Sequence, residues 1–303
     1  MTIHPSAPPN HLAPDELRVR PAADGVSLAI DPARAGWRYL SFRALALGAG
    51  EKLELGGPGT ETAIVVLAGG GLSLVADRST ELRLDGRRTV FDGKPWAAYL
   101  PPDCRARVTA SPLGDGHVVV GIAEAPGSGR DGVATGPVLI APDDVEVEVR
   151  GAGNATRRIH HIVKPTFPAD RLEVVEVYTP AGNWSSWPPH KHDVDDVPNE
   201  AVLEEIYYYQ QRRREGWALQ RLYRREGDGR DGVWAVRHGE LVLVTDGYHP
   251  FVAAHGYDAY YLNALAGDRR TMACSFDPAL EHVRARWSGE DPDPRLPLVP
   301  RPG

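Results

Sequence analysis

The stretch WSSWPPHKHDVDDVPNEAVLEEIYYYQ, residues 184–210, places potential metal ligands on a strand-like background. His190 and His192 are one residue apart, and side chains with this spacing project from the same face of an extended strand. One metal ion can therefore bind both imidazoles, and the carboxylate of Glu205 would neutralise part of its charge. The stretch predicts a metal site built on a β-scaffold.

A further ligand is expected from a different strand. In GELVLVTDGYHP, residues 239–250, an apolar run ends in a glycine turn that delivers His249 at the start of the next strand. Closed structural zinc sites favour cysteine and leave no open position. Three histidines and one carboxylate therefore favour a catalytic metal site over a structural one.

Short alternating or apolar runs recur on both sides of these segments, roughly every eight to twelve residues. They include VSLAI, KLEL, AIVVLA, LSLVA, HVVVGIA, VEVEV, LEVVEVY, WALQRLY, LVLVT and TMACSF. The 32 glycines and 27 prolines suit many turns between short strands. This rhythm predicts an all-β fold of sandwiches or barrels, with one short helix at residues 278–287 that Asp277 caps.

Composition narrows the class of protein. A chain of 303 residues can form one large or two medium domains. The formal charge of −7 and the absence of a long Lys/Arg run argue against nucleic acid as a partner. No apolar stretch approaches the roughly 20 residues that span a bilayer, and the N-terminal residues lack the apolar core of a signal peptide. We therefore expect a cytoplasmic protein without membrane contacts.

A stretch rich in Gly, Pro and Ser, APGSGRDGVATGP at residues 125–137, divides the chain near its middle. Such stretches are typical of domain linkers. We predict an N-terminal domain of residues 1–135 and a C-terminal domain of residues 136–303.

The two halves look related. Glu61 precedes the apolar run AIVVLAGG as Glu205 precedes IYYY, and counting 44 residues on from each reaches Arg105 and His249. No His-x-His precedes Glu61. We therefore expect an N-terminal domain without a metal site, and one metal ion per chain.

A His-x-His, a glutamate and a later histidine on a strand-rich, duplicated chain resemble the cupin superfamily, whose small β-barrels hold a metal ion on three His and one Glu. Here residues 193–204 separate His192 from Glu205, where a common cupin has only a few residues. The blocks GAGNATRRIHHI, SSWPPHKHD, EEIYYYQ, WALQRLY and GELVLVTDGYHPFVAAHGYDAYYLNALAGDRR closely resemble the 5-deoxy-glucuronate isomerase family, over about residues 151–275. The resemblance implies a bicupin, with two tandem β-sandwich or jelly-roll barrels.

By matching position, the resemblance implies four metal ligands, namely His190, His192, Glu205 and His249. Glu204 competes for the carboxylate position. We prefer Glu205 because the Ile-Tyr-Tyr strand follows it directly, so alternation places Glu205, Tyr207 and Tyr209 on one face. We expect zinc or manganese, and imidazole and carboxylate ligands also suit iron and nickel.

The resemblance further implies a metal-dependent aldose-ketose isomerase of myo-inositol catabolism, which converts 5-deoxy-D-glucuronate to 5-dehydro-2-deoxy-D-gluconate. A proton-transfer route and a hydride-shift route both stay open. The candidate general bases are Asp246, Tyr209 and His255. The candidates for binding the substrate carboxylate are Lys191, Arg158, Arg221 and Arg270. The further pocket residues that we expect are Gln220, Tyr207, Tyr261 and Asn263.

Other interpretations remain. The same ligand set serves metal-dependent cupin oxygenases, from which an isomerase differs by working without oxygen. A non-enzymatic sugar-acid binding protein is a second alternative, although a pure binder would not require a full ligand set. His160 and His161 are adjacent and so face opposite sides of a strand, which favours structural roles. Edge strands of a bicupin often pair, which predicts a homo-oligomer.

Overall fold

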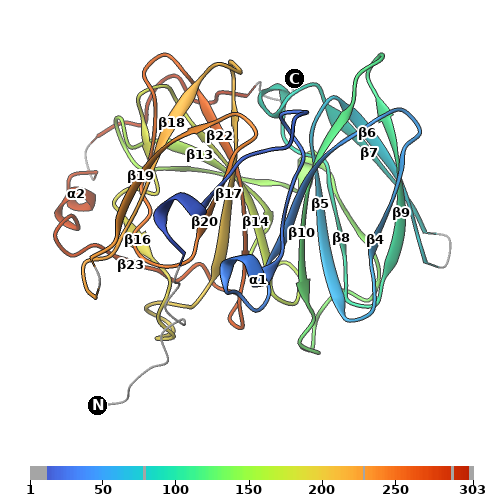
Figure 1. Cartoon of the computed structure of the whole chain (residues 1–303), viewed down its shortest axis with the longest axis horizontal. Helices are drawn as coiled ribbons and strands as arrows, with labels where there is room; N and C mark the ends of the chain where they lie inside the picture. Colours follow the sequence, from blue (N-terminus) through green and yellow to red (C-terminus); the bar gives the residue numbers. More distant parts are fainter. Residues whose placement is uncertain (1–11, 78–79, 228, 288–289, 300–303) are drawn as a thin grey trace.

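The computed structural model describes residues 12–77, 80–227, 229–287 and 290–299, and almost every element in it is a β-strand (Figure 1). The predicted all-β class is confirmed. The α-helices α1 (Pro32–Ala35) and α2 (His282–Ala285) are one turn each. Helix α2 is shorter than predicted, because the Asp277 carboxylate accepts the Ala279 N–H at 2.9 Å in a turn ahead of it. Within the described ranges, no helix is long and apolar enough to cross a membrane.

Five sheets account for the strands. The seven-stranded sheet has the order β1 (Arg18–Val19), β20 (Leu241–Val244), β17 (Glu204–Gln211), β22 (Ala259–Ala266), β14 (Leu172–Thr179), β13 (Arg157–Val163) and β12 (Glu146–Arg150). The six-stranded sheet has the order β11 (Val138–Ile140), β8 (Ala97–Leu100), β5 (Thr60–Ala68), β10 (Val118–Pro126), β3 (Ser41–Leu47) and β2 (Leu28–Ile30).

Two four-stranded sheets and a two-stranded ribbon complete the fold. The first has the order β4 (Lys52–Gly56), β9 (Arg105–Pro112), β6 (Gly70–Ala76) and β7 (Thr80–Arg87). The second has the order β15 (Trp184–Ser185), β21 (Phe251–Ala253), β18 (Trp217–Tyr223) and β19 (Asp231–Arg237). The ribbon pairs β16 (His190–Lys191) with β23 (Ser275–Phe276).

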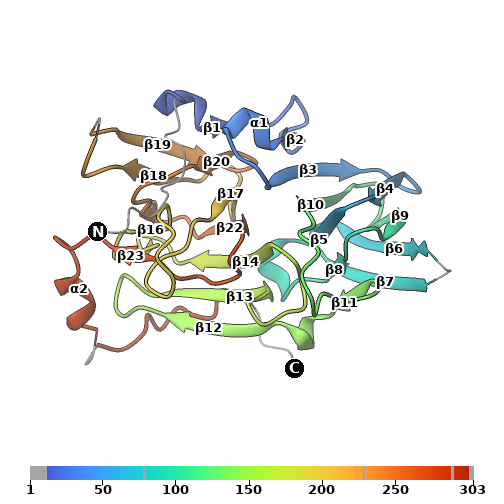
Figure 2. The same ribbon diagram turned by 90° about the horizontal axis from the view of Figure 1, so that it is seen from below.

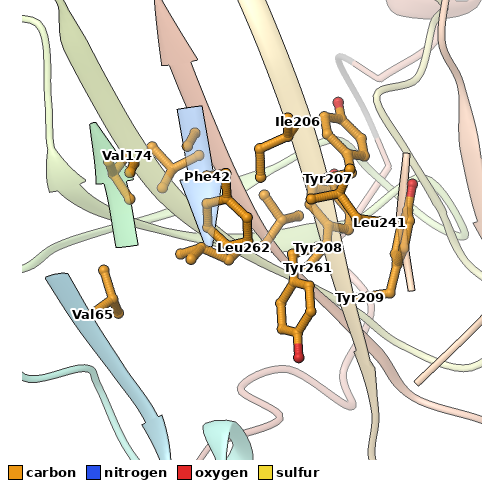
Figure 3. Packing of buried hydrophobic residues seen from close by; sticks show 14 of the residues in the cluster. Phe42, Val65, Val174, Ile206, Tyr207, Tyr208, Tyr209, Leu241, Tyr261 and Leu262 are labelled. Carbon is orange, nitrogen blue, oxygen red and sulfur yellow. The ribbon is translucent and has the colours of Figure 1, made fainter. Parts of the chain in front are cut away.

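The apolar residues pack between these sheets. One core cluster lies between the six-stranded sheet and the first four-stranded sheet, and includes Ile64 and Leu74. A second, larger cluster joins the six-stranded to the seven-stranded sheet, so the two large sheets lie back to back. Figure 3 shows Phe42 close to Leu262 across this junction, and the Phe42 and Tyr208 ring centroids lie 5.7 Å apart. The six-stranded sheet and the first four-stranded sheet form the N-terminal lobe, and the seven-stranded sheet and the second four-stranded sheet form the C-terminal lobe. The larger cluster joins the two lobes.

Two edge strands pair with sheets that are built mainly from the other half of the chain. Strand β1, from the start of the chain, pairs with β20 in the seven-stranded sheet, and β11 pairs with β8 in the six-stranded sheet (Figure 2). The proposed division at residues 135 and 136 therefore separates β11 from the sheet that it joins.

Two carboxylates, the buried Glu61 and the partly buried Glu204, tie the lobes together. Glu61 in β5 accepts the backbone N–H groups of residues 170–172 at 2.6–2.8 Å. Glu204 in β17 accepts those of residues 38–40 at 2.6–2.9 Å. In the related halves, Glu61 therefore corresponds to Glu204. The alignment of Glu61 with Glu205 from the sequence is shifted by one residue, because Glu204 and Glu205 are adjacent at the start of β17.

Candidate metal centre

Three side chains converge inside the C-terminal lobe. The ligand atoms of His192, Glu205 and His249 all lie within 4.8 Å of one another, and all three residues are buried. The Glu205 Oε2 atom lies 2.8 Å from His192 Nε2 and 3.3 Å from His249 Nε2. This brings together residues from β17, from the segment after β16 and from the turn before β21.

The second nitrogen of each imidazole fixes its tautomer. His192 Nδ1 donates to the Leu203 carbonyl at 3.0 Å, and His249 Nδ1 donates to the Gly247 carbonyl at 3.0 Å. Each Nε2 atom therefore faces Glu205, and His249 Nε2 is buried with no hydrogen-bond partner in the described chain. A cation held by both Nε2 atoms and the Glu205 carboxylate would give each of them a partner, so the donor set fits a metal ion.

Neighbouring groups tune these ligands. Asn263 Nδ2 donates to Glu205 Oε1 at 2.6 Å, which orients the other oxygen towards the histidines. Burial would raise the pKa of Glu205, but His192 and His249 outweigh it and lower the pKa, so the carboxylate stays ionised. Burial lowers the pKa of His249 and keeps its imidazole neutral, which is the form that binds metal.

His190 lines the same cavity without joining the close group. Its ring centroid lies 4.6 Å from that of His249, and β16 pairs it with Phe276 of β23. The group within 4.8 Å contains the other three predicted ligands and not His190. His190 therefore lies at the edge of the site, open to the cavity.

The long segment between His192 and Glu205 is organised by charge. Lys191 lies between the two histidines in sequence and turns the opposite way, where its Nζ donates to Asp193 at 2.6 Å and to Glu200 at 2.8 Å. Asp193 also accepts the Gly247 N–H at 2.8 Å, which ties this segment to the turn that carries His249. Lys191 is therefore a structural residue outside the cavity, and its predicted contact with substrate is corrected.

A cavity of about 550 Å³ opens beside the converging ligands. His190, His192 and Glu205 line it, and so do side chains of β12, β13, β22 and the C-terminal segment. Residues that contribute to its walls include Glu148, Arg157, His161, Tyr207, Tyr261 and Trp287. The cavity can hold a small molecule in contact with the metal ligands.

The predicted general bases do not reach this cavity. Asp246 forms ion pairs with Arg224 at 2.5 Å and with Arg230, because the left-handed turn at Gly247 (φ 75°) separates it from His249. Tyr209 is fully buried and donates its hydroxyl to Gln220 at 2.9 Å. His255 is exposed in the turn after β21.

Three predicted carboxylate-binding arginines also lie elsewhere. Arg221 pairs with Asp231 on the surface at 2.6 Å. Arg270 donates to backbone carbonyls near residues 164–172 and braces that loop. Arg158 occupies the face of β13 that does not line the cavity, beside the core shared by the lobes.

The predicted pocket residues divide into two groups. Tyr207, Tyr261 and Asn263 line the cavity, and the two tyrosine rings stack with centroids 4.4 Å apart. Their hydroxyls bond to Ser186 at 2.7 Å and Ser185 at 3.0 Å. Gln220 lies behind the wall, where its amide donates to the His249 carbonyl at 2.9 Å and holds that turn in place.

Sequence reasoning missed a charged group on β12 and β13. Arg157 and His161 line the cavity because alternate residues of β13 share a face, and His161 Nε2 lies 3.0 Å from Glu148 Oε2. Burial would raise the pKa of Glu148, but Arg150 and His161 lower it to about 2. Alternation along β13 separates Arg157 and His161 from Arg158, but the sequence does not show which of the two faces meets the cavity.

Comparison with known proteins gives a consistent result. The model of the KduI/IolB family matches residues 17–283. The 5-deoxy-glucuronate isomerase of Geobacillus kaustophilus is 40% identical over 261 residues, which cover 85% of this chain and 90% of the relative. The 5-deoxy-glucuronate isomerase of Bacillus subtilis strain 168 is 34% identical over 250 residues, which cover 82% of this chain and 89% of the relative.

Solved structures agree. An IolB-like protein from Salmonella typhimurium LT2 superimposes with a TM-score of 0.81 at 35% identity, and the match covers 88% of this chain and 98% of that one. Oxalate decarboxylase of Lactobacillus farciminis has a TM-score of 0.58 at 10% identity, and the match covers 82% of this chain and 83% of that one. This similarity shows a shared fold alone. The resemblance found in the sequence is confirmed, and the chain belongs to the KduI/IolB family.

Proposed function

We propose that the chain is a metal-dependent isomerase that converts 5-deoxy-D-glucuronate to 5-dehydro-2-deoxy-D-gluconate. The observation that carries the proposal is the convergence of His192, Glu205 and His249 beside a cavity of about 550 Å³. The curated relatives that match most of the chain are 5-deoxy-glucuronate isomerases, which supplies the substrate.

The proposed ligands are His190, His192, Glu205 and His249. When bound, a divalent cation supplies Lewis-acid polarisation of the sugar oxygens on the two reacting carbons. Three imidazoles and a carboxylate suit zinc or manganese, and also iron or nickel. The buried Gln220 and Asn263 hold the His249 turn and the Glu205 carboxylate in position for that role.

Proton transfer needs a group inside the cavity, and the His161–Glu148 pair is suited to it. The Glu148 carboxylate accepts from His161 Nε2, which leaves Nδ1 able to accept a proton. A carboxylate that accepts from one ring nitrogen in this way fixes the orientation and tautomer of the imidazole. We therefore assign His161 in place of the predicted bases Asp246, Tyr209 and His255.

The test is carbon NMR of 5-deoxy-glucuronate incubated without oxygen with metal-loaded protein. We expect a ketone signal that disappears after chelation and after His249→Ala, and that returns when zinc or manganese is added to the chelated protein. Asn199→Ala, on the exposed loop ahead of Glu205, is the control. Absence of conversion by protein with a full metal content would contradict the isomerase, and turnover only in oxygen would favour the oxygenase.

The cytoplasmic location, the homo-oligomeric state and the division at residues 135 and 136 stay predictions from the sequence. Size-exclusion chromatography with light scattering tests the oligomeric state directly.

A further inference from the structure

Three arginines line the cavity, and they differ in how their charge is balanced. Arg150 makes a two-pronged ion pair with Glu148 at 2.7 and 2.8 Å. Arg284 is exposed to solvent and lies over the Phe276 ring. Arg157 is only 5% exposed, and no carboxylate in the described ranges pairs with it. Arg157 is therefore the buried cavity cation whose charge the chain leaves unmatched.

The Arg157 guanidinium is held firmly by one nitrogen. Its Nη1 atom donates to the carbonyls of Ala155 and Trp187, each at 3.1 Å. The Trp187 carbonyl belongs to the Ser-Trp-Pro-Pro segment that leads into His190, so this contact fixes the guanidinium relative to the metal ligands. The Trp287 ring centroid lies 5.8 Å from its central carbon.

The other edge of the guanidinium has no protein acceptor. Arg157 Nε and Nη2 donate to no residue in the described part of the chain. Neither atom is among the fully buried atoms without a partner, so both remain accessible from the cavity. These two nitrogens form the planar fork that matches both oxygens of a carboxylate.

A buried cation without a counter-charge destabilises a fold, so an anion bound beside it is strongly favoured. Burial, together with Arg150, lowers the pKa of Arg157 to about 10, and the guanidinium is still a cation at neutral pH. Glu148, the carboxylate whose charge acts on Arg157, is already paired with Arg150 and His161. The missing counter-charge must come from a molecule in the cavity.

We propose that Arg157 binds the carboxylate of the sugar acid through Nε and Nη2, while the opposite end of the same molecule reaches the metal ligands. The identity of the sugar acid rests on the proposed function, whereas the need for an anion rests on Arg157 itself. This assignment replaces Lys191, Arg158, Arg221 and Arg270, which the sequence suggested.

The first experiment compares the acid with its neutral amide. Wild-type protein, Arg157→Gln, Arg157→Lys and the surface control Arg221→Gln are assayed with 5-deoxy-glucuronate and with its primary amide. We expect Arg157→Gln to raise KM for the acid about 100-fold, with a smaller change in kcat, and to abolish the preference for acid over amide. Arg157→Lys keeps the charge without the fork, so its effect should be about tenfold. Metal content and circular dichroism should match wild type.

The second experiment does not need turnover. Calorimetry measures binding of the alcohol obtained by reducing the substrate aldehyde, an acid that cannot isomerise, and of the amide of that alcohol. Loss of the acid-over-amide preference in folded, metal-loaded Arg157→Gln supports the inference even if the wild type isomerises nothing, a result that would overturn only the proposed function. An unchanged preference in Arg157→Gln overturns the role of Arg157 and leaves the isomerase intact.

Discussion

Asn263 shows how a residue that does not itself bind metal can control a metal site. Its Nδ2 atom donates to Glu205 Oε1 at 2.6 Å and to the Ile206 carbonyl at 3.1 Å. The amide therefore decides which carboxylate oxygen turns towards His192 and His249. Partners of this kind typically contribute about 10- to 100-fold to metal affinity.

We predict that Asn263→Ala lowers the affinity for zinc about 10- to 100-fold, because Glu205 is then free to rotate. Competition titration against a colorimetric chelator measures the change. Asn199→Ala serves as the control because Asn199 is exposed and bonds to Asp196 at 3.1 Å, away from the cavity. Equal affinity in both variants would show that the carboxylate is held by its histidine neighbours alone.

Glu173 is a buried acid of a different kind. It is fully buried on β14, and neither carboxylate oxygen has a hydrogen-bond partner within the described ranges. It lies on the same face of the seven-stranded sheet as Glu205, because register places Glu173 and Glu205 on either side of Leu265. Burial raises its pKa to about 7, with Arg270 and His192 opposing the effect.

This raised pKa predicts a pH-dependent stability. Below about pH 4.5 the carboxyl is protonated in the folded and unfolded chains, so it has no effect. Between about pH 4.5 and 7 only the unfolded chain ionises, so the free energy of unfolding falls as pH rises, and above about pH 7 the loss is constant. The total is on the order of 3 kcal/mol.

Glu173→Gln should remove this slope. We expect its melting temperature to exceed that of wild type by an amount that grows from pH 5 to pH 7 and then levels off, measured by scanning calorimetry with metal in excess. Glu215→Gln, on the surface, should follow the wild-type profile. Parallel profiles for Glu173→Gln and wild type would mean that Glu173 is ionised in the folded chain.

At the scale of the element, close approach of the two large sheets depends on Gly121 in β10. A Cβ atom there would lie 2.6 Å from Leu262 Cδ2 and 3.4 Å from Phe42 Cζ. Figure 3 shows Phe42 and Leu262 close together at the junction of the two sheets. The glycine therefore lets β10 and β22 pack without a side chain between them.

Gly121→Val should lower the free energy of unfolding by about 1–3 kcal/mol, since the added methyl groups force the sheets apart. Urea unfolding followed by tryptophan fluorescence measures this. Gly136→Ala is the control, because a Cβ atom at Gly136 meets nothing within 4 Å and its φ is not positive. A variant at Gly121 as stable as the Gly136 control would show that Leu262 can move without cost.

At the scale of the whole molecule, Glu61 and Glu204 connect the two lobes reciprocally. Each lies at the start of a central strand of its own sheet and accepts three consecutive backbone N–H groups at the entry to a strand of the other sheet. Figure 1 shows the lobes side by side, with β5 and β17 on either side of their junction. The same contact thus occurs twice, related by the duplication of the chain.

We predict that Glu61→Gln and Glu204→Gln each lower the free energy of unfolding by about 1–3 kcal/mol, because an amide has one acceptor oxygen and its NH2 group faces other donors. Chemical denaturation measures the loss. Glu54→Gln, which breaks only a surface ion pair with Arg107, should cost under about 1 kcal/mol. If all three variants unfold together, the carboxylates do not hold the lobes.

The sequence by itself determined the all-β class, the location of the metal-ligand candidates and the family. Period-two patterns and turn residues act locally, and alternation from Glu205 correctly separated Tyr207 and Tyr209 from Tyr208. Spacing alone also suggested that His190 and His192 share a face. These inferences need only the geometry of an extended chain.

Only the tertiary structure decided which charged residues meet the substrate cavity. Both faces of β13 are buried, so its sequence shows no polar-apolar alternation that would distinguish the face of Arg157 from that of Arg158. The turn at Gly247 carries Asp246 away from His249, although they are three residues apart. Glu148 and His161 meet through strand pairing between β12 and β13. Partners chosen by sheet register and by contact between lobes are invisible to local pattern, because they depend on residues distant in sequence.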